Sequence, residues 1–200
     1  MSDIVELHRR VMATSTDVVG KLSAHQLELG TPCAGWTVRD LLAHMIGQNY
    51  GFGAAASQRA GTDAFGSRPV GPDPVGEYAR SAEFVVAAFA APGLLERSVY
   101  LAEIRGGIEV PVATAISFHL VDYVAHSWDL GVSIGSLPVF DDEVLGAALR
   151  VAEAVPDDAN RTVPGAAFAP AVQIDAGTAG TVLNRILALL GRDPSWRQAA

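Results

Sequence analysis

The stretch from Val112 to Ile134 constrains the fold more than any other part of the sequence. Its apolar residues keep helical periodicity throughout, Pro111 suits the first turn of a helix, and Gly135 stops the pattern. The sequence therefore predicts one long helix here. Such a helix is stabilised by packing its apolar face, so the fold class depends on what the other segments form.

Most of the other segments also show helical patterns. A second helix is signalled after the connector 30–35, which contains Gly and Pro, because Thr37 and Asp40 have the spacing of a capping box. Further helices are predicted over Asp3 to Leu29, about Val75 to Ala91, Asp141 to Val155 and Thr178 to Leu190. Residues 98–104 and 108–110 flank Arg105-Gly106-Gly107 and predict a short β-hairpin instead.

These elements predict an all-α protein: a four-helix bundle with a short β-hairpin before the fourth long helix and a short helical C-terminal tail. We expect residues 1–200 to form a single domain, with the bundle in about 1–135 and a helical C-terminal extension in about 136–200.

The composition excludes several classes of partner. Lysine and arginine total 14 residues against 22 aspartates and glutamates, and the formal net charge is -8, so the chain lacks the basic surplus that nucleic acids or anionic membranes require. Its apolar runs fall short of the ~20 residues that span a bilayer. The N-terminus lacks the pattern of a secretory signal, and Cys33, the single cysteine, excludes an intramolecular disulfide. We therefore expect a cytoplasmic protein.

The predicted fourth helix carries an unusual polar stripe. His119, Asp122, His126 and Asp129 follow one another at steps of three, four and three, so they project along one side of the helix. Their neighbours are largely apolar, which indicates that part of the stripe faces inward. Burying such groups without partners costs several kcal/mol, about 2–7 for a neutral polar group.

A divalent metal ion would offset that cost. Asp122 and His126, one helical turn apart, can place an oxygen and a nitrogen about 2.0–2.2 Å from one ion. His44, in the otherwise apolar second helix, is the natural third ligand. Three protein ligands leave one position open for water or substrate. Zinc ranks first for this donor set, and nickel, iron and manganese also fit.

Simpler interpretations stay open from the residues alone. His44 could be an ordinary hydrogen-bonded residue at the edge of the core, and Asp122 with His126 could be a surface pair. Asp129 could orient His126. Cys33 is interpreted as a structural residue rather than a nucleophile, because no histidine or acid adjoins it in sequence. His8 and His25, flanked by polar residues, are predicted to be exposed.

Three motifs resemble a known family. They are Thr31-Pro32-Cys33-Ala34-Gly35-Trp36-Thr37-Val38-Arg39-Asp40-Leu41-Leu42-Ala43-His44, the segment from His119 to Leu130, and Leu189-Leu190-Gly191-Arg192-Asp193-Pro194. Over nearly its whole length the chain resembles the DinB-like metal-binding superfamily, in the actinobacterial branch related to the N-terminal domain of mycothiol-dependent maleylpyruvate isomerase.

The resemblance implies a four-helix bundle that holds a metal through His44, Asp122 and His126. The isomerase pattern has a glutamate where this chain has the shorter Asp122, which makes His119 a candidate fourth ligand. The resemblance also implies a metal that binds and activates a low-molecular-weight thiol such as mycothiol. The isomerase carries a further C-terminal domain, whereas this chain has a short helical tail after Gly135, so we do not carry over maleylpyruvate isomerisation.

Two hypotheses about function follow. The first is a metal- and thiol-dependent transferase or isomerase, which takes a small-molecule substrate and a low-molecular-weight thiol, with Asp129 and His119 as supporting or proton-transfer groups. The alternative is a non-enzymatic metal-binding bundle with a structural, sensing or partner-binding role. In either case a homodimer is possible, and nothing in the sequence specifies its interface.

Overall fold

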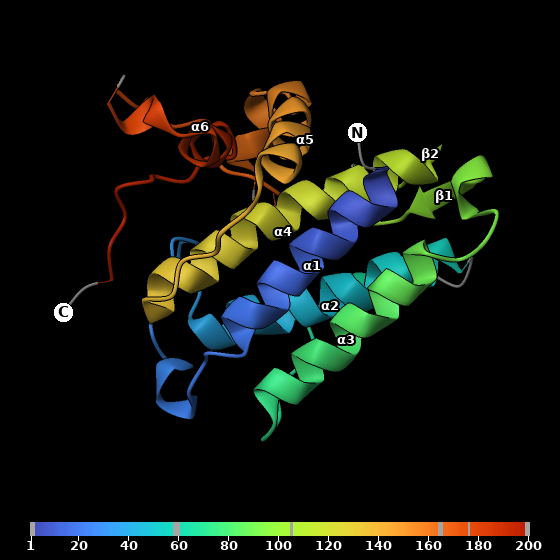
Figure 1. Cartoon of the computed structure of the whole chain (residues 1–200), viewed down its shortest axis with the longest axis horizontal. Helices are drawn as coiled ribbons and strands as arrows, with labels where there is room; N and C mark the ends of the chain where they lie inside the picture. Colours follow the sequence, from blue (N-terminus) through green and yellow to red (C-terminus); the bar gives the residue numbers. More distant parts are fainter. Residues whose placement is uncertain (1–2, 58–60, 105, 164–165, 176, 199–200) are drawn as a thin grey trace.

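Four long helices pack side by side in a computed structural model that describes residues 3–57, 61–104, 106–163, 166–175 and 177–198. They are α1 (Ile4–Val19), α2 (Val38–Ala56), α3 (Pro74–Phe89) and α4 (Val112–Ile134). Helix α1 packs against α3 and α4, and α2 packs against the same two helices, so the four surround one core (Figure 1). The predicted all-α bundle is confirmed.

A two-stranded antiparallel hairpin precedes α4, as predicted. Strand β1 (Ser98–Leu101) pairs with β2 (Ile108–Pro111), with Ser98 opposite Pro111 and Leu101 opposite Ile108. The amide of Val112 donates to the carbonyl of Arg97 at 3.0 Å, which ties the hairpin to the first residue of α4. Arg105, in the predicted turn, lies outside the described residues.

The C-terminal segment adds two helices to the bundle. Helix α5 (Asp142–Ala154) packs against α4 and α1, and α6 (Val182–Leu189) packs against α5. In Figure 1 these orange and red helices lie on the α4 side of the bundle. The segment also contains single turns of 3₁₀ helix at Ala159–Thr162 and Thr178–Gly180.

The first helix is shorter than its periodicity predicts. It ends at Val19, and a 3₁₀ turn at Ala24–Gln26 follows instead of continued α-helix. The physical reason is that Leu22 and Leu27 are buried in the core from the irregular segment after α1 rather than from a helix. Apolar residues at roughly helical spacing therefore extended the predicted helix toward Leu29. The last helix likewise starts later than predicted, at Val182.

One local feature fixes where α2 begins, and one contact holds it against α4. The predicted capping box is present: the amide of Asp40 donates to Thr37 Oγ1 at 3.2 Å, and the amide of Thr37 donates to Asp40 Oδ2 at 3.0 Å. Farther along α2, the hydroxyl of Tyr123 in α4 donates to the carbonyl of Met45. Both partners are buried, so this bond holds the residue next to His44 against α4.

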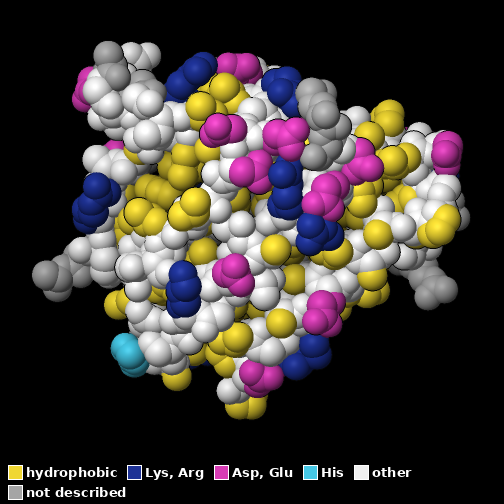
Figure 2. Space-filling view, in the orientation of Figure 1, with side chains coloured by type: hydrophobic (Ala, Val, Ile, Leu, Met, Phe, Trp, Pro, Cys, Tyr) yellow, Lys and Arg dark blue, Asp and Glu magenta, His cyan; other side chains and the backbone are white. Residues whose placement is uncertain are grey.

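Charged and apolar side chains are mixed on the face of the protein that Figure 2 shows. On the face drawn in Figure 2, Lys and Arg side chains lie scattered among Asp and Glu side chains and apolar groups. Among the helices of the described residues, none is both long and apolar enough to cross a membrane.

Candidate metal centre

Helices α2 and α4 bring the three predicted ligands together. One ligand atom from each of His44, Asp122 and His126 lies within 4.8 Å of the other two. His126 Nε2 stands 3.4 Å from Asp122 Oδ1, and the rings of His44 and His126 meet edge to face with centroids 5.2 Å apart. Two ligands at about 2.1 Å from a tetrahedral ion are about 3.4 Å apart, so the Asp122 and His126 atoms have the spacing that zinc requires.

The three side chains differ in their access to solvent. The side chain of His126 is 5% exposed, that of Asp122 is 19% exposed, and His44 is half-buried. The indole of Trp36 packs against the His44 ring at 5.0 Å and is itself partly exposed. An ion bound here would therefore be held from inside by His126 and reached from the side of His44 and Asp122.

A further carboxylate contacts the helix that carries His44. Gln48, one helical turn after His44, donates to Glu103 Oε2 at 3.0 Å, and Glu103 comes from the segment that links β1 to β2. Partial burial raises the pKa of Glu103, and the charge of Asp122 raises it further. Sequence reasoning missed Glu103, because nothing local to the hairpin indicates that it faces α2.

The other nitrogen of His126 faces a buried cluster of charges. His126 Nδ1 lies 2.9 Å from Asp129 Oδ2. Arg192 donates to the same oxygen through Nε at 3.3 Å and Nη2 at 3.1 Å, and the thiol of Cys33 donates to it at 3.3 Å. Asp129 is fully buried, and its Oδ1 has no hydrogen-bond partner in the described part of the chain.

Cys33, His126 and Asp129 also bring donor atoms within 4.8 Å of one another and form a second conceivable ion site. Arg192 argues against it. Its Nη2 lies 3.1 Å from Asp129 Oδ2 and 4.0 Å from the sulfur of Cys33, so a fixed cation already neutralises this group. A divalent ion placed there would meet the guanidinium at close range in a medium of low dielectric. The group of His44, Asp122 and His126 is therefore the better cation site.

The pKa values of the two candidate histidine ligands are shifted in opposite directions. Burial alone would lower the pKa of His126, but the charge of Asp122 and the hydrogen bond to Asp129 raise it to about 10. Burial and, to a smaller extent, the neighbouring His126 together lower the pKa of His44 to about 4. Burial alone would raise the pKa of Asp129, yet the charge of Arg192 and the bond from His126 hold it below its usual value.

His119 does not join the three ligands. It lies seven residues before His126, or about 10.5 Å along the helix axis, and is fully buried. Its Nδ1 lies 3.0 Å from His8 Nε2, and its ring stacks on Tyr123 at 4.1 Å. Burial holds the pKa of His119 well below its usual value. The fourth-ligand hypothesis for His119 therefore has no geometric support.

The prediction that His8 is exposed is wrong, whereas His25 is exposed as predicted. His8 is 1% exposed, and burial lowers its pKa to about 3. Its polar neighbours in α1 gave no warning, because the partner that accounts for its burial, His119, lies 111 residues away in the chain.

Arg192 was not predicted as part of the site, although it lies in the third motif. Helix α6 ends in a Schellman motif: the amide of Gly191 donates to Ala188 and that of Arg192 to Leu187, at 3.1 and 2.8 Å. Gly191 has φ of 79°, and a Cβ there would lie 2.5 Å from the carbonyl oxygen of Ala169. Glycine is therefore required to turn the chain and direct Arg192 toward Asp129.

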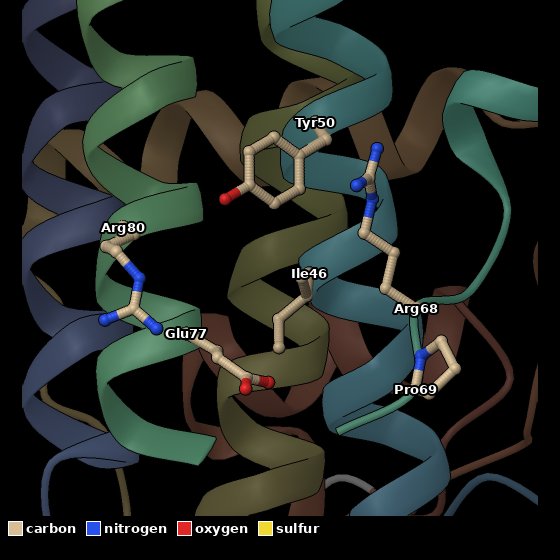
Figure 3. A pocket seen from close by; sticks show the side chains of 6 residues that line it. All are labelled: Ile46, Tyr50, Arg68, Pro69, Glu77 and Arg80. Carbon is tan, nitrogen blue, oxygen red and sulfur yellow. The ribbon is translucent and has the colours of Figure 1, made fainter. Parts of the chain in front are cut away.

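A separate pocket lies between α2, α3 and the segment that joins them (Figure 3). It is lined by Ile46, Tyr50, Arg68, Pro69, Glu77 and Arg80. The guanidinium of Arg68 lies over the ring of Tyr50, 4.3 Å from its centroid. The three candidate ligands are not among its lining residues, so this pocket is distinct from the candidate metal centre.

Comparison with known proteins supports the fold and the family. A profile of the mycothiol maleylpyruvate isomerase N-terminal domain matches residues 8–131. Two uncharacterised proteins from two strains of Mycobacterium tuberculosis are each 30% identical over 153 residues, which is 76% of this chain and 79% of each relative. The crystal structures of the mycothiol-dependent maleylpyruvate isomerase and of a mutant of it align with a TM-score of 0.56 at 15% identity, over 76% of this chain and 70% of theirs.

A helical bundle with a hairpin before its fourth helix, aligned with these structures, defines a DinB-like fold. The matched profile covers well over half of the chain and includes His44, Asp122 and His126. The chain belongs to the mycothiol maleylpyruvate isomerase N-terminal domain family. The structural alignment, at 15% identity, supports the fold alone.

Proposed function

We propose that this protein is a transferase or isomerase that depends on a low-molecular-weight thiol. In this proposal it binds one divalent metal ion through His44, Asp122 and His126. The convergence of these three side chains from two helices within 4.8 Å carries the proposal. Membership of a family named for a mycothiol-dependent enzyme supports the thiol. Two imidazoles and one carboxylate, without a thiolate, suit zinc first, and nickel, iron or manganese also fit.

The residues around the ion have separable roles in this proposal. A bound divalent ion would lower the pKa of a coordinated thiol and so supply a thiolate nucleophile near neutral pH. Asp129 holds the His126 ring through Nδ1, which turns Nε2 toward Asp122 and His44. The half-exposed side of the site, bordered by Trp36, is where a thiol and a small substrate would enter.

Thiol binding can be tested directly with cobalt in place of zinc. We expect addition of mycothiol to the Co²⁺-loaded protein to produce an intense near-ultraviolet sulfur-to-cobalt charge-transfer band, because the three ligands leave a coordination position open. The control is methylated mycothiol, whose thioether cannot form a thiolate. A Co²⁺-loaded protein whose spectrum does not respond to mycothiol would reject the thiol-dependent enzyme and favour the non-enzymatic metal-binding bundle.

Metal binding should release a proton near neutral pH. The pKa of about 10 keeps His126 protonated at pH 7, and the ion must displace the proton on Nε2. His44, with a pKa of about 4, is already neutral. We expect release of about one proton per ion at pH 7, and a metal affinity that rises with pH until His126 titrates near pH 10. Calorimetry in two buffers of different ionisation enthalpy measures the proton count, and identical heats in both would contradict the prediction.

A further inference from the structure

We propose that Arg192, supplied by the C-terminal extension, is a positioning residue for the metal site. It acts through Asp129 on His126, so the extension and the bundle form one functional unit. This inference rests on the proposed metal site. It goes beyond the three ligands, because it assigns a role to a segment that lies outside the matched N-terminal domain profile.

Arg192 is held as firmly as a core residue. It is 8% exposed, and its Nε and Nη2 both donate to Asp129 Oδ2. Its Nη1 donates to the carbonyl of Leu190 at 2.8 Å, and the guanidinium lies 5.5 Å from the ring centroid of Phe168. All three nitrogens are thus engaged inside the protein, which leaves the group poorly placed to bind an external anion.

The chemistry of the cluster determines which nitrogen of His126 is free. A guanidinium can only donate hydrogen bonds, so the Asp129 oxygen that it binds is an acceptor. An acceptor 2.9 Å from His126 Nδ1 places the ring proton on Nδ1 and leaves the lone pair of the neutral ring on Nε2. Nε2 is the nitrogen that lies 3.4 Å from Asp122. Arg192 therefore favours the tautomer and the ring orientation that an ion needs.

The fold of the C-terminal extension places the Arg192 side chain next to Asp129. Helix α5 packs against α1 and α4, α6 ends at Leu189, and the Schellman motif that closes it turns the chain at Gly191, directly before Arg192. A second buried arginine, Arg161, closes the extension on itself by donating to the carbonyls of Pro156, Val155, Ala169 and Leu189. In the described part of the chain, Arg161 makes no hydrogen bond or ion pair with Cys33, His126, Asp129 or Arg192, which makes it a matched control.

The test measures the affinity of the full chain for Zn²⁺ alone, by competition with a chromophoric chelator, at a temperature where every variant is folded. We expect Arg192→Gln to weaken zinc binding by up to roughly 10–100-fold, the usual effect of losing an outer partner of a metal ligand, because Asp129, the direct partner of His126, is then no longer held. Arg192→Lys should weaken zinc binding less than Arg192→Gln, because lysine keeps a hydrogen-bond donor and the positive charge but lacks the planar pair of donors of the guanidinium. The Co²⁺ visible spectrum of Arg192→Gln should also change, since the His126 ring is no longer held.

The control variant separates positioning from general stability. Arg161→Gln should lower the urea midpoint yet, in the folded protein, weaken zinc binding and change the Co²⁺ spectrum far less than Arg192→Gln does. If Arg192→Gln does not fold, Arg192→Lys and Arg161→Lys form the deciding pair, and the first should weaken zinc binding clearly more than the second.

Two results would overturn the inference while leaving the metal site intact: unchanged zinc affinity in the Arg192 variants, or equal weakening in the Arg192 and Arg161 variants. A wild-type protein that binds no zinc would instead overturn the proposed metal site, and this inference with it.

Discussion

Replacement of His126 by alanine is expected to reduce the metal content of the purified protein to background. His126 is the ligand that both neighbours converge on: Asp122 lies 3.4 Å from its Nε2, and the His44 ring meets its edge. The loss in metal affinity on removal of a direct ligand should be larger than the roughly 10–100-fold loss that follows removal of an outer partner. Plasma mass spectrometry on untagged protein, purified without chelator, measures the metal content of wild type and variant.

A histidine outside the site supplies the control. His25 is exposed in the 3₁₀ turn after α1, so His25→Ala should retain the wild-type metal content. Equal metal in His126→Ala and wild type would place the ion elsewhere. No metal in the wild type, even after incubation with zinc, nickel, iron and manganese salts, would refute the site as a functional feature.

Replacement of Asp129 by alanine is expected to cause the largest loss of stability. It leaves Arg192, which is 8% exposed, without its carboxylate partner in the protein interior. Removing one partner of a buried ion pair costs about 3–5 kcal/mol, because the remaining charge is uncompensated. Urea unfolding of chelator-treated protein measures the loss in the free energy of unfolding, without a contribution from bound metal.

Two comparisons identify the cause of that loss. Glu28→Ala breaks an ion pair with Arg39 in which the glutamate side chain is 70% exposed, and it should leave the urea midpoint unchanged. The double variant Asp129→Ala/Arg192→Ala should cost less than the sum of the two single variants, since no lone charge remains buried. If Asp129→Ala lowered the free energy of unfolding by less than about 1 kcal/mol, water would have to reach Arg192, and the cluster would not exclude solvent.

The fold was largely predictable because its signals are local. The long fourth helix, its limits at Pro111 and Gly135, and the capping box at Thr37 are written in neighbouring residues, and the structure has them as predicted. The prediction of the first helix went too far, since Leu22 and Leu29 continue the helical spacing but lie in the irregular segment after α1. Periodicity reports which residues face the core and does not by itself report how the backbone delivers them.

The site was predictable only in part. The spacing of Asp122 and His126 along one helix, with the resemblance, was enough to nominate the three candidate ligands. The burial of His8 against His119, and the meeting of Arg192 and Cys33 at Asp129, were not predicted. Each of these contacts joins residues about 60 or more positions apart, where no helical or strand period operates.

The sequence by itself determined the long helices of the bundle, the start of α2, both ends of α4 and the pair Asp122 and His126, since these depend on hydrogen bonds and spacings within a few residues. Only the tertiary structure decided which of the polar residues in α4 share one environment. Asp122 and His126 lie close to His44. Asp129 forms an ion pair with Arg192 from the C-terminal extension. His119 is buried beside His8. The physical reason is that a buried polar side chain is defined by the partner that compensates its burial, and that partner is chosen by the packing of distant segments.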